Sequence, residues 1–248
     1  MAQNRRHTQH EVRTGVPFLL CELHAHTTWS DGELSLYELV DLYGVAGFDV
    51  LCVTDHTHSE HDPWVHLGVR PERLAEYFRA VEEQAERARS LYNLLVLPGL
   101  ELTDNAPEPD AAAHALAVGL STPVTMEHGI HSAMTAANKA GAAIIAAHPA
   151  GPESRGPGVT RRFWCEHEAF SDIVHRWELI NGHTVFPWIS EARLQVVANG
   201  DFHRPEHLTS WKTMLPCEKT EEAIVDFLRS PARAQLTVFD PVSQQLAA

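Results

Sequence analysis

Four short apolar runs of the sequence each lead directly into histidine or aspartate. The runs are 18–23, 49–54, 142–147 and 195–198, and the residues that follow them are His24, His26, Asp31, Asp55, His56, His148, Asp201 and His203. Neutral imidazole nitrogens and ionised carboxylates are the ligands that divalent transition metals bind in proteins. Several such groups clustered without a cation would be costly to bury. The repeated pattern therefore predicts a metal site.

The apolar runs are the expected strands of an α/β sheet. In a sheet of parallel strands with helices packed outside, side chains at the carboxyl ends of the strands converge on one mouth. A capping box at Ser35–Glu38 predicts the start of one helix. Apolar residues at helical spacing predict further helices over about 71–92, 126–140 and 220–228. Strands that alternate with helices favour a barrel or a wound sheet.

Length and composition indicate one large domain. The 248 residues fit a flexible tail over 1–16 followed by a single domain over 17–248. No apolar stretch approaches 18 residues, so no membrane span is expected. The polar start predicts no export, and four cysteines without a CxxC pair suit a reducing compartment, so we expect a cytoplasmic protein.

The formal charge of −14 disfavours binding to long nucleic acids, which usually needs a basic face. A short phosphorylated substrate remains compatible with this charge, including a short oligonucleotide. Two or three divalent cations at the mouth would add roughly four to six positive charges where such a substrate binds.

The assembled motifs resemble those of the PHP family, named for polymerase-associated and histidinol-phosphatase domains. The resemblance runs from about Leu20 to Phe239. The matching segments, in order, are His24-Ala25-His26, Ser30-Asp31-Gly32, Thr54-Asp55-His56, Pro98-Gly99-Leu100-Glu101, His114, His148-Pro149 and Asp201-Phe202-His203. Each motif alone is weak, but their order and completeness make the joint signal strong.

The resemblance implies a distorted (β/α)7 barrel with two or three divalent metal ions. The first ion would take His24, His26, Glu101 and Asp201; the second would share Glu101 and add His114 and His148; the third would take Asp31, His56 and His203. Glu101 is then the bridge. Mixed imidazole and carboxylate ligands fit Mn, Zn or Fe.

The expected activity is hydrolysis of a small phosphorylated molecule. A hydroxide that bridges two ions would attack phosphorus, and Asp201 or His203 would move a proton. Arg161 and Arg162 follow a Gly/Pro-rich loop and are candidates for binding phosphate, because guanidinium matches its oxygens.

Other polar residues near the motifs have weaker interpretations. Asp55, Glu178 and Asn181 end predicted strands and are expected to orient ligands. The remaining histidines after the second motif, His58, His61 and His66, are interpreted as loop residues.

Two other functions stay open. One is a non-catalytic metal-binding module that supports a partner protein, in which metal would stabilise the fold without turnover. The other is hydrolysis of an amide or a cyclic ester by a related metal barrel.

Overall fold

The computed structural model describes residues 17–155 and 159–241, so the expected 1–16 tail lies outside the described residues. The strands are β1 (Leu19–Glu22), β2 (Val50–Val53), β3 (His56–His58), β4 (Leu95–Asp104), β5 (Ala113–Val118), β6 (Ala143–Ala147), β7 (Arg176–Asn181), β8 (Thr184–Val185), β9 (Val196–Asn199), β10 (Ser210–Leu215) and β11 (Gln235–Phe239). The α-helices are α1 (Leu36–Val45), α2 (Leu74–Tyr92), α3 (Gly129–Lys139), α4 (Arg162–Phe170), α5 (Pro187–Glu191) and α6 (Glu221–Arg229).

The strands form one mixed sheet in the order β11-β10-β1-β2-β4-β5-β6-β7-β8, with β3 added beside β4 and β9 beside β7. Strands β1, β2 and β4 are parallel to one another, and so are β6, β7 and β9. Strand β5 is antiparallel to both β4 and β6, so all six run the same way. The apolar runs that precede the metal motifs therefore do end at one edge.

Strand β5 departs from the parallel arrangement of its neighbours, and the connection between β4 and β5 gives the reason. Parallel neighbours need a crossover of about a dozen residues or more. Only the short segment 105–112 joins β4 to β5, so the chain turns back and the two strands pair antiparallel.

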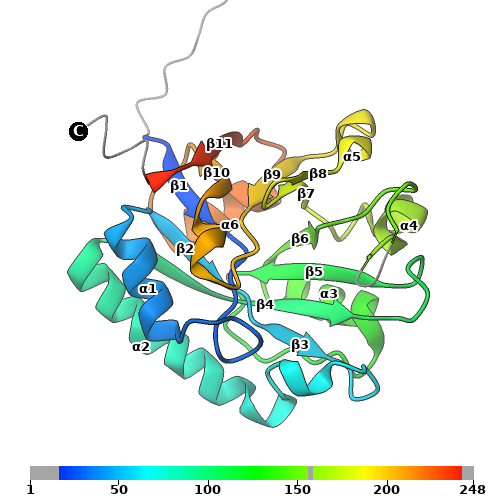
Figure 1. Cartoon of the computed structure of the whole chain (residues 1–248), viewed down its shortest axis with the longest axis horizontal. Helices are drawn as coiled ribbons and strands as arrows, with labels where there is room; N and C mark the ends of the chain where they lie inside the picture. The colour runs from blue at the N-terminus through cyan, green and yellow to red at the C-terminus, as the bar shows by residue number, and fades with distance from the viewer. Residues whose placement is uncertain (1–16, 156–158, 242–248) are drawn as a thin grey trace, which may run out of the picture.

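The sheet curls into a half-barrel (Figure 1). The curl brings β9 close to β10, where the Thr213 hydroxyl donates to the carbonyl of Ala198 at 2.8 Å and accepts from the Ala198 amide at 2.9 Å. A side chain, not a run of backbone pairs, thus bridges these strands in the described chain. The protein is a barrel-like α/β fold, and the count of seven β/α units stays a prediction.

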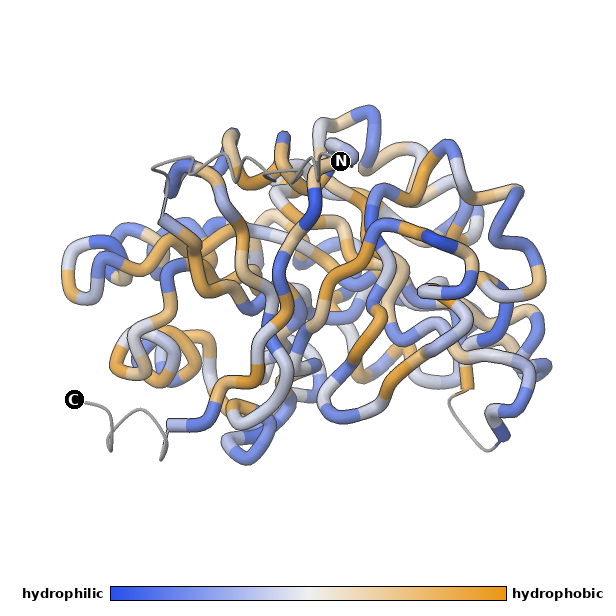
Figure 2. The backbone as a smooth tube through the Cα atoms, turned by 90° about the horizontal axis from the view of Figure 1, so that it is seen from above, coloured by the Kyte–Doolittle hydropathy of each residue, from blue (hydrophilic) through white to orange (hydrophobic). Residues whose placement is uncertain are grey.

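Two apolar clusters stabilise this sheet. One gathers residues from seven strands, including Cys21, Cys52 and Ile145, together with Ile224 and Leu228 of α6. Because these strands surround it, this cluster fills the inside of the curl and α6 covers one end. Hydrophobic segments accordingly run through the middle of the molecule in Figure 2, while hydrophilic ones are frequent in peripheral loops.

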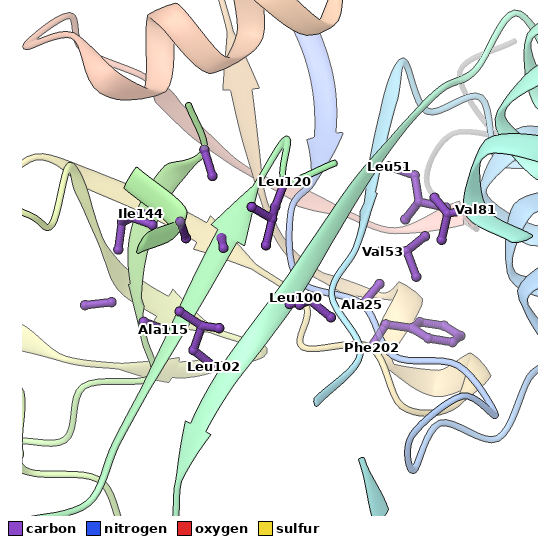
Figure 3. Close-up of a cluster of buried hydrophobic side chains, with 14 of the residues drawn as sticks. Ala25, Leu51, Val53, Val81, Leu100, Leu102, Ala115, Leu120, Ile144 and Phe202 are labelled. Carbon is purple, nitrogen blue, oxygen red and sulfur yellow. The ribbon is translucent and has the colours of Figure 1, made fainter. Parts of the chain in front are cut away.

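The second cluster lies between the sheet and the helices α1, α2 and α3. Figure 3 shows Leu51 and Val53 of β2 directed toward Val81 of α2. The amphipathic pattern over 71–92 predicts this helix, which begins with a 3-10 turn at Pro71–Arg73. The predicted capping box is present as well, because Ser35 and Glu38 exchange hydrogen bonds at the start of α1.

The sequence does not predict strands β3, β8 and β11 or helices α4 and α5. Strand β3 matters most, because it turns the segment after Asp55 into a buried edge that pairs with β4. In the described part of the chain, no helix combines the length and apolar character needed to cross a membrane.

Candidate metal centre

Strand register brings the metal motifs together. Strand β3 places His56 opposite Glu101 in β4, and β5 places His114 beside Ala147, the residue before His148. A backbone pairing between Ala25 and Phe202 brings the segment 24–26 against 201–203. Glu101 thus lies inside a strand, and His56 and His114 lie at or near the start of one, whereas the other proposed ligands follow the ends of β1, β6 and β9.

Four buried atoms face one another at the centre of the site. His24 Nε2 lies 3.3 Å from both Glu101 Oε2 and Asp201 Oδ1. His26 Nε2 lies 3.3 Å and 3.4 Å from the same two oxygens. Within residues 17–155 and 159–241, none of these four atoms has a hydrogen-bonding partner.

Buried polar atoms in native proteins are almost always paired, and unpaired ones need an explanation. A cation coordinated by two imidazole nitrogens and two carboxylate oxygens would supply the partner that all four atoms lack. The residues present therefore fit a divalent metal ion.

The other oxygen of Glu101 faces two more histidines. Glu101 Oε1 lies 3.0 Å from His114 Nδ1 and 3.2 Å from His148 Nε2. Ligand-type atoms of His24, Glu101 and His148 lie within 4.8 Å of one another, and so do those of His56, Glu101 and His114. The Glu101 carboxylate thus faces two adjacent groups of imidazoles, as a carboxylate that bridges two metal ions would.

A third group forms around Asp31. Asp31 Oδ1 lies 3.3 Å from His203 Nε2 and 3.6 Å from His56 Nε2, and His26 Nδ1 approaches to 3.8 Å. His56 also places its Nδ1 atom 2.9 Å from Glu101 Oε2. In this geometry His56 therefore faces two groups, which the family motif alone does not indicate.

The carboxylates of the centre stay ionised despite burial. Desolvation would raise the pKa of Glu101, but the neighbouring His56, His24 and His114 hold it well below its usual range. Burial likewise opposes the lowered pKa of Asp201, which His24, His26 and His203 outweigh. Burial would lower the pKa of His24, yet Asp201, Glu178 and Glu101 raise it. Protons and cations therefore compete for His24.

Glu178 forms hydrogen bonds that hold two of the proposed ligands, His24 and His148, in position. Its Oε1 atom accepts hydrogen bonds from His24 Nδ1 and Asn199 Nδ2, both at 2.9 Å. Its Oε2 atom accepts from the backbone amide of His148 at 2.7 Å and from Asn181 Nδ2 at 2.9 Å. A carboxylate that binds the second nitrogen of a ligating histidine fixes the orientation of the ring. Glu178 and Asn181 thus contact proposed ligand residues, as expected.

The turn that carries Asp201 depends on a buried ion pair. Lys212 Nζ lies 2.5 Å from Glu22 Oε2, and the backbone amide of Gly200 donates to the same carboxylate.

Asp201 has a φ of 51° and His148 a φ of 29°, a left-handed conformation that is uncommon outside glycine. Such conformations cluster at functional sites, where the surrounding structure enforces them.

Asp55 acts on the loop that carries Asp31. It accepts hydrogen bonds from the Thr27 amide at 2.8 Å, from the Thr27 hydroxyl at 2.9 Å and from the Ser30 hydroxyl at 2.6 Å. Asp55 therefore acts on Asp31 indirectly, by holding this loop in position.

The two candidate phosphate-binding arginines lie at the start of α4, and each forms an ion pair with a carboxylate. Arg161 Nε lies 2.7 Å from Asp110 Oδ1, and Arg162 Nε lies 3.1 Å from Glu166 Oε2. Both ion pairs are partly exposed, so water screens and weakens them. Replacing the carboxylate partner of either arginine by a phosphate therefore costs little free energy.

His58 is the residue that the sequence interpretation missed. The expectation of a loop residue is wrong, because His58 belongs to β3 and is buried, whereas His61 and His66 are exposed. Its Nδ1 atom lies 3.4 Å from Asp62 Oδ2. The signal available in the sequence was the alternation His56-Thr57-His58, which is typical of a short strand.

Two hollows open on the centre. The first, of about 300 Å³, is lined by Asp31, His56, His58, Trp64, Leu67, Asn105 and His114. The second, of about 370 Å³, is lined by His148, Ala150, Ser154, Val159, Thr160, Asn181, Thr184, Phe186 and Asp201. A larger hollow of about 820 Å³ between α2 and the start of α6 contains none of the nine proposed ligands.

Comparison with known proteins supports the same kind of site. No family model matches the sequence, and no curated relative matches it. A crystal structure from Bacteroides vulgatus, a two-domain protein containing a predicted PHP-like metal-dependent phosphoesterase, matches with 26% identity and a TM-score of 0.69. The match covers 96% of this chain and 69% of that one.

Two further structures are less similar. A candidate metal-dependent phosphoesterase from Bifidobacterium adolescentis has 15% identity and a TM-score of 0.48, over 74% of this chain and 87% of that one. An amidohydrolase from Chromobacterium violaceum, solved with sulfate and no metal, has 15% identity and a TM-score of 0.49, over 75% and 88%.

Proposed function

The chain is a PHP-like protein, and we propose that it hydrolyses phosphoesters of small molecules with two or three divalent metal ions, Mn, Zn or Fe, bound at the centre. The observation that carries this proposal is the set of four buried, mutually facing atoms of His24, His26, Glu101 and Asp201 that lack hydrogen-bonding partners among the described residues. The likeness to the Bacteroides vulgatus protein that contains a predicted PHP-like metal-dependent phosphoesterase supports the reaction class.

The proposed division of labour follows the geometry. His24, His26, Glu101 and Asp201 would bind one ion; Glu101, His114 and His148 a second; Asp31, His56 and His203 a third. Bound divalent ions would lower the pKa of water and neutralise charge on the phosphoryl oxygens. The protein's own part is to fix these side chains, through Glu178, Glu22 and Asp55, before the substrate arrives.

Proton transfer is assigned to Asp201 and His203. His203 Nδ1 lies 3.4 Å from Asp201 Oδ1, and 28% of the His203 side chain is exposed, so it can reach the substrate. Burial would lower the pKa of His203, but Asp31 and Asp201 raise it. We propose that this pair passes a proton to the leaving oxygen.

The substrate is proposed to be small. Arg161 and Arg162 would exchange their present carboxylate partners for phosphate oxygens. The net charge of −14 speaks against long nucleic acids and leaves short oligonucleotides as candidates.

The test is phosphate release from a panel of phosphoesters with Mn or Zn. The wild-type chain should turn over at least one ester, and His26→Ala should lose about a hundredfold or more of that activity. His61→Ala, which removes an exposed imidazole, is the matched control and should retain it. Equal activity in wild type and His26→Ala would refute the proposal. If metal stabilises the chain but no ester is turned over, the result would instead support the non-catalytic metal-binding module. If only amides or cyclic esters are turned over, it would support the hydrolysis of those substrates as the function.

A further inference from the structure

The two hollows share no lining residue, and different proposed metal ligands line each of them. Asp31, His56 and His114 form the wall of the first hollow, and His148 and Asp201 that of the second. The walls adjoin at His114 and His148, whose ring centroids are 4.9 Å apart and which both face Glu101 Oε1. The hollows therefore flank the carboxylate that serves two imidazole groups.

This arrangement has a consequence for the substrate. A phosphorus atom held at the centre has room for one substituent in the first hollow and for another in the second. A phosphomonoester carries a single substituent and fills only one of them. Resting on the proposed function, we infer that the site is built for phosphodiesters, with one ester group in each hollow.

The first hollow is suited to a planar group. Trp64 is 53% exposed there and Leu67 lies beside it, so an aromatic substituent would cover apolar surface. Asp62 fixes this wall, because it accepts hydrogen bonds from the Trp64 amide at 2.8 Å and from the Asn105 amide at 3.0 Å.

His58 gives an independent sign of a ligand in the first hollow. Its Nε2 atom is buried and has no hydrogen-bonding partner within the described ranges. The side chain is 3% exposed and lines the hollow. A polar atom on the planar substituent would give this nitrogen the partner that buried groups normally have.

The second hollow is more mixed in character. Thr160, Asn181 and Thr184 contribute hydroxyl and amide groups, while Phe186 contributes an apolar wall. Asn181 uses its Nδ2 atom for Glu178 and Asp201, at 2.9 Å and 3.2 Å. Its carbonyl oxygen is the group that remains to accept a hydrogen bond from a substituent.

The first test compares bis(4-nitrophenyl) phosphate with 4-nitrophenyl phosphate on the metal-loaded full chain. The diester should have a kcat/KM higher by about tenfold or more, because it places a group in each hollow. A preference for the monoester would overturn the inference while leaving the phosphoesterase function intact.

Filling each hollow separately makes the test specific. Leu67→Trp narrows the first hollow and Thr184→Trp the second, and each should lower kcat/KM for the diester about fivefold more than for the monoester. Their matched controls are His66→Trp and Val185→Trp, at exposed neighbouring positions that do not line a hollow. Equal losses for both esters would contradict a two-sided site.

A binding measurement separates this inference from turnover. Diphenylphosphinate carries a ring on each side of phosphorus and phenylphosphonate carries one, and neither has an ester bond to hydrolyse. Calorimetry should show the phosphinate binding about fivefold tighter or more, with Leu67→Trp and Thr184→Trp each reducing that difference. If neither ester is hydrolysed, the proposed function fails, and this binding comparison still decides the two-sided site. Equal affinities would overturn it.

Discussion

Glu178 Oε1 accepts a hydrogen bond from His24 Nδ1 across 2.9 Å, and both side chains are fully buried. Because Nδ1 is engaged in this way, the opposite nitrogen, Nε2, points at Glu101 and Asp201. The same carboxylate accepts the backbone amide of His148. One acid, outside the proposed ligand set, thus sets the positions of two ligands.

Replacing this acid should weaken metal binding without unfolding the chain. Glu178→Gln removes the charge opposite His24 Nδ1, and we expect affinity for Mn to fall by about 10- to 100-fold. Titration calorimetry measures the affinity, and circular dichroism checks the fold. Glu191→Gln, at an exposed position in α5, is the control and should bind as wild type does. An unchanged affinity in Glu178→Gln would show that His24 is oriented by other contacts.

The turn at Gly200 has no room for a side chain. A Cβ atom there would lie 2.5 Å from Glu22 Oε2 and would also meet Lys212 Nζ. We expect Gly200→Ala to shift Asp201, to weaken metal binding and to lower the free energy of unfolding by about 1–3 kcal/mol. Urea unfolding with and without Mn measures both effects.

Gly47→Ala provides the comparison for that experiment. Gly47 has a φ of 79° and open space around it, so alanine there costs about 1 kcal/mol of backbone strain and leaves the centre untouched. If Gly200→Ala and Gly47→Ala bind Mn equally well, the turn does not position Asp201.

His175, which is not among the proposed metal ligands, is expected to make the free energy of unfolding depend on pH. Burial, with help from Arg229 and Arg176, lowers its pKa from 6.5 to about 4. Between these values the unfolded chain binds more protons than the folded one, so this contribution to stability is complete above the unfolded pKa and is lost as the pH falls toward 4.

The His175→Gln variant isolates this contribution. Wild type should lose stability more steeply than the variant between pH 6.5 and pH 4, in urea unfolding measured at several pH values. The difference between the two chains removes the titration of the metal-centre histidines, which both share. Parallel curves would mean that His175 titrates alike in folded and unfolded chains.

The two arginines at the start of α4 predict a change in substrate affinity. If they bind phosphate, Arg161→Gln and Arg162→Gln should each raise KM roughly tenfold with little change in kcat, the loss of one charge-assisted hydrogen bond. Steady-state kinetics on the best ester measures this. A KM that stays at the wild-type value in both variants would assign the arginines to their ion pairs with Asp110 and Glu166 alone.

Local patterns predict much of this molecule. The capping box at Ser35, the apolar stripe over 71–92 and the apolar runs before the histidine motifs each determine an element within a few residues. These signals are local, because they depend on residues that are neighbours in one helix or strand.

The features that the sequence does not predict depend on contacts between distant segments. His58 is polar and looks like part of a loop, and only the pairing of β3 with β4 buries it. The antiparallel β5 places His114 near a strand start, and the Glu22–Lys212 pair forms across 190 residues of chain. No local periodicity specifies such pairings, since they depend on which strands lie beside each other in the sheet.

A crystal grown with manganese tests the central claim most directly. Anomalous scattering should place at least two ions among the nine proposed ligands, with one ion bound by His24, His26, Glu101 and Asp201. Glu101→Gln, which weakens the proposed bridge, should lower the occupancy of the ions it joins. An anomalous map without peaks at these residues, in a crystal where their side chains are ordered, would contradict the account.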